Sequence, residues 1–235
     1  MTDRPILFSD EMVRAILDGR KTQTRRVLRQ QPLDIIPMPA RNEWVTLETR
    51  DPNHGRVIRC RFGIPGDRLW LREAWKISSF MEGEPIEFQY RADGACAPEN
   101  EYANAPENMI AYEEWYERVC SKDTDWLYAH SWPHNEDGIF TWGASKSPLP
   151  WRPSIFMPRW ASRITLEIAS IVVERVDQIS DADIVAEGVT VRPEWTPGPE
   201  SRRAEFGLLW DGINAKRGFS YDKAPWVWKI EFRKV

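Results

Sequence analysis

The sequence predicts an α+β protein that is mainly β, built as a small barrel of strands with a few helices at its rim. Two observations support this fold class. Short segments rich in β-branched and aromatic residues recur between turn residues, and the few helical segments do not alternate with strands as they do in βαβ units. The chain has 235 residues, of which 42% are hydrophobic, which is enough to build a core.

The clearest strands lie in the second half of the chain. Apolar residues alternate through residues 163–176, and from Trp226 onward every second residue is large and apolar, as in a strand with one buried face. Shorter strands are expected over residues 20–28 and 68–75. Several prolines divide residues 30–62 into loops and short strands.

Three helices are expected around these strands. The first covers residues 9–18 and ends at Gly19, where a left-handed residue closes many helices. Ser180 begins a capping-box pattern that predicts a helix over residues 181–187. Residues 200–214 are amphipathic. The apolar stripe of this third helix consists of Phe206, Leu209 and Ile213.

Charge is distributed unevenly along the chain. Residues 81–125 contain twelve acidic and three basic residues, so this segment has a net charge of −9. Because the whole chain has a net charge of −4, the remaining residues together carry +5. The pattern predicts a mildly basic domain over residues 1–79 and 151–235, with an acidic, Trp-rich insertion over residues 80–150. The insertion is expected to be irregular, with one helix over residues 109–120, and to serve as a lid or a partner surface. A simple solvated helical face is the alternative.

Composition excludes several classes of protein. The total charge of −4 does not fit a polycation that wraps duplex DNA. Three widely spaced cysteines (Cys60, Cys96 and Cys120) do not form the framework of a disulfide-rich secreted domain. The N-terminus lacks the apolar region of a signal peptide, and no apolar run reaches the roughly 18 residues of a membrane span. We therefore expect a cytoplasmic protein with no membrane partner.

The segment that follows Gly19 holds the most informative residues, because Lys21, Thr24 and Arg26 fall within six positions. A lysine is a weak base at its ordinary pKa, since its amine is already protonated. Burial or the neighbouring arginines would lower that pKa and leave a neutral amine. Such an amine could take the proton of a threonine hydroxyl and make the hydroxyl a nucleophile. The alternative is an ordinary basic edge that holds phosphates.

The spacing Gly19-x-Lys21-x-x-Thr24-x-Arg26 resembles G-x-K-x-x-E-x-R, the signature of the ASCH domain in the PUA-like superfamily. Thr24 stands where the general signature has glutamate. The small bacterial N(4)-acetylcytidine amidohydrolases, an ASCH subgroup, carry threonine there. Their stretch resembles G-R-K-T-x-T-x-R, and residues 19–26 match each fixed position.

Weaker similarities lie elsewhere in the chain. The turn at residues 66–67, the segment 176–187 that ends at Glu187, and the closing segment 228–232 resemble parts of the same family. The similarity covers under half of the chain, and residues 80–160 have no counterpart in the small enzymes. The overall layout also resembles uncharacterised ASCH-like proteins of bacteriophages and prophages.

This resemblance implies a PUA-like barrel that hydrolyses an acyl group on the exocyclic amine of a cytidine-type nucleoside. Thr24 would attack the acyl carbonyl, Lys21 would deprotonate Thr24, and Glu187 would protonate the leaving amine. No metal and no cofactor is implied. A surface carboxylate at the end of a helix is the alternative interpretation of Glu187.

Five further residues are candidates for binding the substrate. Arg26 belongs to the motif, and Trp70, Trp75 and Trp160 offer flat faces on which a base can stack. Glu73 could accept a hydrogen bond from a base amine, or it could pair with Arg26 or the arginine that precedes it. Most tryptophans fill cores, so packing is the alternative for all three.

Other functions remain open at the level of the sequence. The same pocket could seat a base of RNA or single-stranded DNA without turnover. The wider ASCH resemblance also allows a nuclease. A phage accessory factor that binds a protein through the insertion is a fourth hypothesis. His130 and His134 are four positions apart, but Pro133 breaks a helix that would align them, so no metal site is expected.

Overall fold

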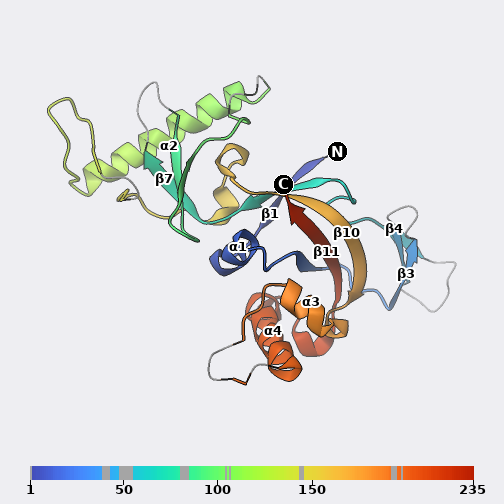
Figure 1. The fold of residues 1–235 in the computed structure, drawn as a ribbon. Helices are drawn as coiled ribbons and strands as arrows, with labels where there is room; N and C mark the ends of the chain where they lie inside the picture. Colours follow the sequence, from blue (N-terminus) through green and yellow to red (C-terminus); the bar gives the residue numbers. More distant parts are fainter. Residues whose placement is uncertain are drawn as a thin grey trace. The chain divides into compact units, whose positions relative to one another are not determined.

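The computed structural model describes residues 2–38, 43–47, 55–79, 85–103, 105, 107–142, 146–191, 195–196 and 198–235. The chain divides into two compact units (Figure 1). The first unit consists of Met1–Arg4, Ala15–Leu69 and Thr165–Val235, and the second of Pro5–Arg14 and Trp70–Ile164. The second unit therefore extends beyond residues 80–150 on both sides and includes part of the N-terminal segment.

The main sheet has five strands in the order β1-β6-β10-β11-β2. Their bounds are Asp3–Leu7 (β1), Gln23–Val27 (β2), Arg68–Arg72 (β6), Thr165–Arg175 (β10) and Trp226–Lys234 (β11). Both β10 and β2 pair antiparallel with β11, and Thr24 lies opposite Ile230. In the described part of the chain β1 and β2 are edge strands, so the closed barrel is not confirmed. The broader prediction of a mainly β, α+β fold is confirmed.

Alternation along β11 gives the sheet two different faces. The residues at even positions, Trp228, Ile230 and Phe232, are buried on one face. On this face Trp228 contacts Trp44 edge-on, with ring centroids 4.7 Å apart. Trp44 belongs to a separate three-stranded sheet of β3 (Asp34–Met38), β4 (Glu43–Leu47) and β5 (Arg56–Ile58). The strands expected within residues 30–62 thus form a second layer instead of closing the first sheet.

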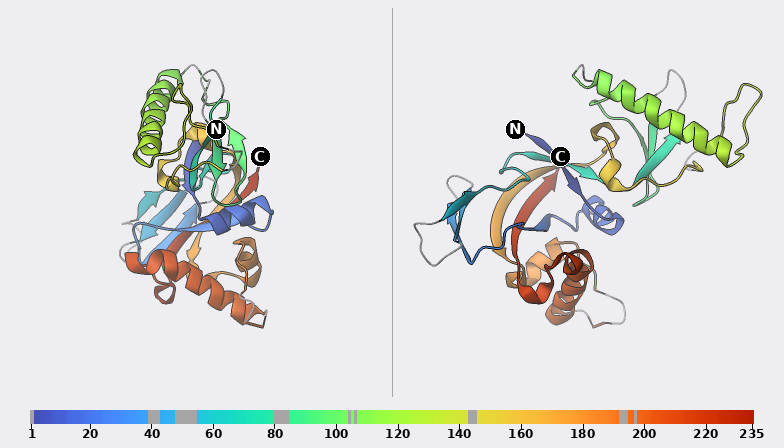
Figure 2. Two further views of the ribbon diagram at one scale, coloured as in Figure 1. Left: turned by 90° about the vertical axis from the view of Figure 1, so that its left-hand side faces the viewer. Right: turned by 180° about the vertical axis from the view of Figure 1, so that it is seen from behind.

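Helices cover the other face of the main sheet. They are α3 (Asp181–Ala186) and α4 (Pro199–Asn214), and Val227 packs with both in one apolar cluster (Figure 2). Ser180 caps α3 as predicted, because its hydroxyl accepts a hydrogen bond from the N–H of Asp183 at 3.1 Å. The predicted stripe of α4 is correct at Phe206 and wrong beyond it: the other buried side chains are Trp210 and Asn214, whereas Ile213 is exposed. A shift of one position in the i, i+4 pattern accounts for the error.

The second unit has its own sheet and its own core. Strands β7 (Trp75–Ser79), β8 (Glu87–Tyr90) and β9 (Cys96–Pro98) form an antiparallel sheet, and α2 (Met109–Ala129) packs along it. The helix is longer than the predicted 109–120. Ile86, Phe88 and Tyr90 alternate into this core. Residues 80–150 are therefore not the largely irregular insertion that the acidic composition suggested.

The N-terminal helix α1 (Asp10–Leu17) begins and ends close to its predicted bounds. Gly19 has φ of +72°, which confirms the expected left-handed residue after the helix. Among the described helices, none is long and apolar enough to cross a membrane.

Candidate functional site

The turn after α1 positions Lys21 in the first unit. The carbonyl oxygen of Ala15 accepts hydrogen bonds from the N–H groups of Arg20 and Lys21, both at 2.9 Å. Lys21 then forms an isolated antiparallel bridge with Glu187, the residue that follows α3. The backbone of the motif is therefore tied directly to the end of α3, although the two lie 166 positions apart in the sequence.

Lys21 and Glu187 form a buried ion pair. The Lys21 Nζ lies 2.6 Å from Glu187 Oε2 and also donates to the Glu187 carbonyl oxygen at 2.8 Å. Only 2% of the Lys21 side chain and 7% of the Glu187 side chain are exposed. Burial lowers the pKa of Lys21; Glu187 opposes this effect, and Arg26 and Arg25 add to it. This is the environment in which a lysine amine can exchange a proton.

Gly188 allows this close approach. Its φ is +77°, and a Cβ placed on it would lie 2.9 Å from the Cβ atoms of both Ala15 and Lys21. A larger residue would push Lys21 away from Glu187. Gly188, the residue after Glu187, thus controls the geometry of the ion pair.

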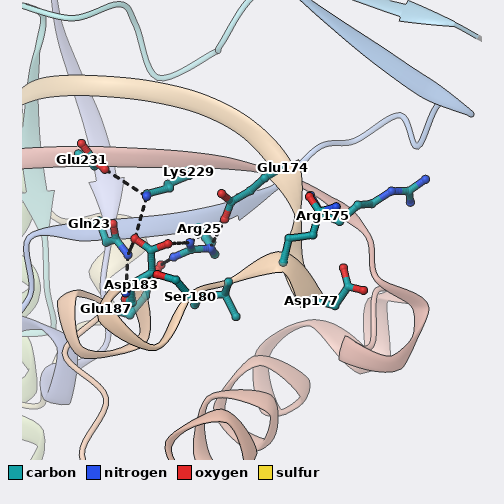
Figure 3. Close-up of polar contacts among 12 residues, drawn as sticks. Gln23, Arg25, Glu174, Arg175, Asp177, Ser180, Asp183, Glu187, Lys229 and Glu231 are labelled. Carbon is teal, nitrogen blue, oxygen red and sulfur yellow. Dashed lines mark hydrogen bonds and ion pairs between the residues drawn. The ribbon is translucent and has the colours of Figure 1, made fainter. Parts of the chain in front are cut away.

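The second oxygen of Glu187 is held by Arg25. Arg25 Nη1 donates to Glu187 Oε1 at 3.1 Å, while its Nε donates to Glu174 Oε1 at 2.7 Å (Figure 3). Arg25 Nη2 also lies 3.1 Å from Asp183 Oδ2. One buried guanidinium therefore joins carboxylates from β10, from α3 and from the residue after α3, and it fixes the Glu187 carboxylate in place.

A further ion pair ties α3 to β11. Lys229 Nζ lies 2.7 Å from Asp183 Oδ1, and Gln23 Nε2 donates to the same oxygen at 3.1 Å (Figure 3). Burial acts to raise the pKa of Asp183, but hydrogen bonds from Lys229, Gln23 and Ser180 outweigh it and lower this pKa. No described contact joins Lys229 to Lys21 or Glu187, so we assign the Lys229–Asp183 pair a structural role.

Thr24 and Arg26 point toward the other face of β2. They pair with Ile230 and Trp228, whereas Gln23 and Arg25 alternate with them and contact α3. Thr24 is buried, and its hydroxyl makes no hydrogen bond to a described residue. Burial lowers the pKa of Arg26 to about 10, opposed by the charge of Glu187. The structure thus brings Lys21 and Glu187 into contact but leaves Thr24 outside that contact.

The remaining predicted residues lie in the second unit. Glu73 is 1% exposed, and both of its oxygens accept hydrogen bonds from Arg163, each at 2.9 Å. This pairing replaces the expected one with Arg72 or Arg26. Because both carboxylate oxygens are engaged by one guanidinium, Glu73 has a structural partner and is not available as an open acceptor.

The three tryptophans of the prediction also lie in the second unit. Trp75 is 1% exposed inside the core, so it has no face for a base to stack on. Trp160 packs edge-on against Trp115, with ring centroids 5.4 Å apart. Trp70 is buried with the Arg72 guanidinium 4.6 Å from its ring centroid. Packing, which was the alternative interpretation, describes the surroundings of all three.

Sequence reasoning missed the network around Arg25. A usable signal exists, because polar and charged residues alternate in two paired strands, as Gln23 and Arg25 in β2 and as Lys229 and Glu231 in β11. Such alternation on a strand marks one polar face. Among the described residues, no group of three or more His, Cys, Asp or Glu side chains is arranged to hold a metal ion.

Comparisons with protein-family models, with curated proteins and with solved structures find no match to this chain. The similarity to the ASCH signature therefore rests on the motif residues themselves. Their local geometry, with Lys21 buried against Glu187, is what supports a functional interpretation.

Proposed function

We propose that the protein hydrolyses the acyl group of an N-acylated, cytidine-type nucleoside, with Lys21 and Glu187 as its proton-transfer pair. The supporting observation is the buried contact between these two side chains, at 2.6 Å and with very little exposure of either. Buried ionisable groups with shifted pKa values cluster at catalytic sites. The resemblance of residues 19–26 to the amidohydrolase motif indicates the reaction.

In the proposed reaction, the Lys21 ammonium first passes its proton to the Glu187 carboxylate, which gives a neutral amine and a carboxylic acid. Thr24 Oγ then attacks the acyl carbonyl carbon, and its proton passes to the neutral amine of Lys21. The carbon–nitrogen bond then breaks, and the exocyclic amine takes a proton from Glu187. Water releases the acyl group from Thr24 as a carboxylic acid. Arg26 lies on the same strand face as Thr24, two residues away, and would stabilise the oxyanion that forms during the attack.

The mechanism requires Lys21 to leave Glu187 and reach the Thr24 hydroxyl when substrate binds. Hydrogen bonds at catalytic sites are often formed only in the complex with substrate. A lysine has four flexible side-chain bonds, and the Lys21 backbone lies three residues from Thr24. As part of the same proposal, we interpret β2, β10 and β11 as strands of a PUA-like barrel.

The burial of the basic residues favours a hydrolase over a surface that binds phosphates. A phosphate-binding edge needs accessible cations, yet Lys21 is 3% exposed and Arg25 is 5% exposed. Arg25 is also neutralised by three carboxylates. We further propose that the protein acts in the cytoplasm, which fits its three free cysteines.

The proposal is tested by incubating the purified protein with a panel of N-acylated cytidines and following deacylation by chromatography. Thr24→Val keeps the shape of the side chain and removes the hydroxyl. We expect this variant to lose turnover while binding the nucleoside within about tenfold of the wild type, since one neutral hydrogen bond contributes roughly 0.5–1.5 kcal/mol. Thr22→Val, which alters a neighbouring threonine, is the matched control and should retain turnover.

Two results would contradict the proposal. A wild-type protein that deacylates none of the nucleosides would reject the hydrolase. Deacylation that Thr24→Val leaves unchanged would reject Thr24 as the nucleophile, because a water molecule would then attack the acyl group. Adding RNA to the panel tests the nuclease, which would release shorter strands and leave the acyl groups in place.

A further inference from the structure

The second unit contains an open pocket of about 480 Å³, and every described residue of its lining belongs to that unit. This volume lies in the range of pockets that bind small molecules. The lining comes from residues 8–11 at the start of α1, from Ala74 and Arg91, and from Trp151, Pro153 and Ser154. None of these residues takes part in the proposed deacylation.

Trp151 provides a flat platform in this pocket. Its side chain is 38% exposed, although its ring is held by a cation: the Lys76 Nζ lies 4.7 Å from the ring centroid. Lys76 is itself buried and donates to the carbonyl oxygen of Ser147. The ring is therefore fixed yet open to solvent, which is the arrangement that lets a second flat group stack on it.

The other walls combine apolar and acidic groups. Phe8 and Pro153 add apolar surface beside the platform. Asp10 Oδ2 accepts a hydrogen bond from Arg91 Nε at 2.6 Å. Glu11 is exposed and makes no ion pair with a residue that the structure describes. Two carboxylates against one guanidinium disfavour a phosphate and favour a ligand that donates hydrogen bonds.

We propose that this pocket binds a planar heteroaromatic ring that carries an amino group, which is the chemistry of a cytosine or adenine base. The ring stacks on Trp151, and its amino group donates to the carboxylates of Asp10 and Glu11. The base can come from a free nucleoside or from a single-stranded nucleic acid. Binding here does not depend on Lys21 or on the proposed hydrolysis.

Isothermal titration of the full chain with cytidine, adenosine and uridine tests the site. Cytidine and adenosine should bind, and uridine, which lacks the amino group, should bind at least about tenfold more weakly. Trp151→Ala should weaken cytidine binding by about 5- to 150-fold, the usual range for a lost base–aromatic stack. Trp151→Phe should stay within a few-fold of the wild type because it keeps a flat ring.

A short oligodeoxycytidine distinguishes the two sources of the base. Binding that is tighter than that of cytidine and that weakens with salt would indicate a single strand, and equal binding would indicate a free nucleoside. Phe156→Ser is the control for nonspecific binding to exposed apolar surface. Phe156 is 68% exposed and lies two residues beyond the pocket lining, so this change should leave binding unaltered.

Several outcomes would overturn the inference: no binding by any nucleoside, equal binding of uridine and cytidine, or unchanged binding by Trp151→Ala. If Trp151→Ala fails to fold, Glu11→Gln replaces it, because a change at the exposed Glu11 should not disturb folding. Glu11→Gln should weaken the binding of cytidine and leave the binding of uridine unchanged. Lys21→Met separates the two proposals. If it abolishes cytidine binding and Trp151→Ala does not, the base binds at the catalytic site and this inference fails while the hydrolase stands.

Discussion

Each unit of the protein buries a carboxylate against a cation, but the two pairs differ in the cation they use. In the first unit Glu187 meets the amine of Lys21 at 2.6 Å. In the second unit Glu73 meets the guanidinium of Arg163 through two hydrogen bonds of 2.9 Å. Both carboxylates are almost completely buried.

The difference in cation implies a difference in role. A guanidinium stays protonated in proteins and matches both oxygens of a carboxylate, so the Arg163–Glu73 pair acts as a rigid clamp. A buried lysine amine shifts its pKa readily and can release its proton. The pKa of Lys21 is lowered, as that role requires. We therefore expect substitutions in the first pair to act on turnover and those in the second to act on stability.

The largest effect is expected from Lys21→Met. Removing the amine removes the general base, so kcat for deacylation should fall by roughly 10²- to 10⁴-fold. The measurement is single-turnover deacylation at a temperature where the variant is folded by circular dichroism. The wild-type rate should also fall as the pH rises through the pKa of Lys21, which burial lowers below the ordinary lysine value, because the pair then loses the proton that Glu187 donates.

Lys229→Met is the control for this prediction. Lys229 belongs to an ion pair on the same sheet face but makes no described contact with Lys21 or Glu187. The control should keep its turnover per folded molecule. Equal losses in the two variants would contradict a proton-transfer role for Lys21 and would assign both lysines to structure.

The second pair is tested by Arg163→Met, which leaves Glu73 buried without its main partner. Breaking a buried ion pair from one side typically destabilises by about 3–5 kcal/mol, so the urea midpoint should fall clearly. Glu73→Gln should cost less, because Arg163 keeps two hydrogen bonds to Asp93 at 2.9 and 3.0 Å. Turnover per folded molecule should not change in either variant.

Arg202→Met is the matched control for stability. Arg202 also holds a carboxylate, that of Asp181, through two hydrogen bonds of 2.7 and 2.6 Å, but this pair is partly exposed, with 26% of the Arg202 side chain and 41% of the Asp181 side chain open to solvent. Solvent-exposed ion pairs contribute little to stability, so the urea midpoint of Arg202→Met should stay near that of the wild type. A larger loss in Arg202→Met than in Arg163→Met would refute the clamp interpretation.

The same contrast explains how much of each unit the sequence could predict. In the first unit, local signals were sufficient for Gly19, for the Ser180 cap and for the strand that begins at Trp226, and the structure confirms them. Each of these features depends on a few neighbouring residues with strong conformational preferences. The Arg25 network was missed because its partners come from distant segments.

In the second unit the acidic composition concealed the core. The run from Ile86 to Tyr90 alternates apolar and polar residues, yet it is only five residues long and lies among many acids. Its acids lie mainly on the surface, and composition does not distinguish a solvated face from an irregular insertion. The partner of Glu73 lies 90 positions away, which no local pattern reveals.

The smallest expected effect concerns Asp183, which belongs to neither pair but borders the first. Hydrogen bonds from Lys229 and Gln23 lower its pKa in the folded state. A carboxyl group with a depressed folded-state pKa stabilises the fold above its unfolded value of about 3.9, and this contribution is lost as the pH falls toward the folded value. Asp183→Asn should therefore be less stable than the wild type by about 1.5–3 kcal/mol at neutral pH, a magnitude typical of hydrogen bonds to charged groups.

As the pH falls below about 4, the stability of the wild type should approach that of Asp183→Asn, because protonation neutralises the same group in both proteins. Urea unfolding at a series of pH values measures this convergence. Asp125→Asn is the control, since Asp125 is exposed on α2 and makes no ion pair with a described residue. Its stability should parallel that of the wild type throughout. A gap between wild type and Asp183→Asn that persists at low pH would mean that residue 183 stabilises α3 through packing and not through the charge of its carboxylate.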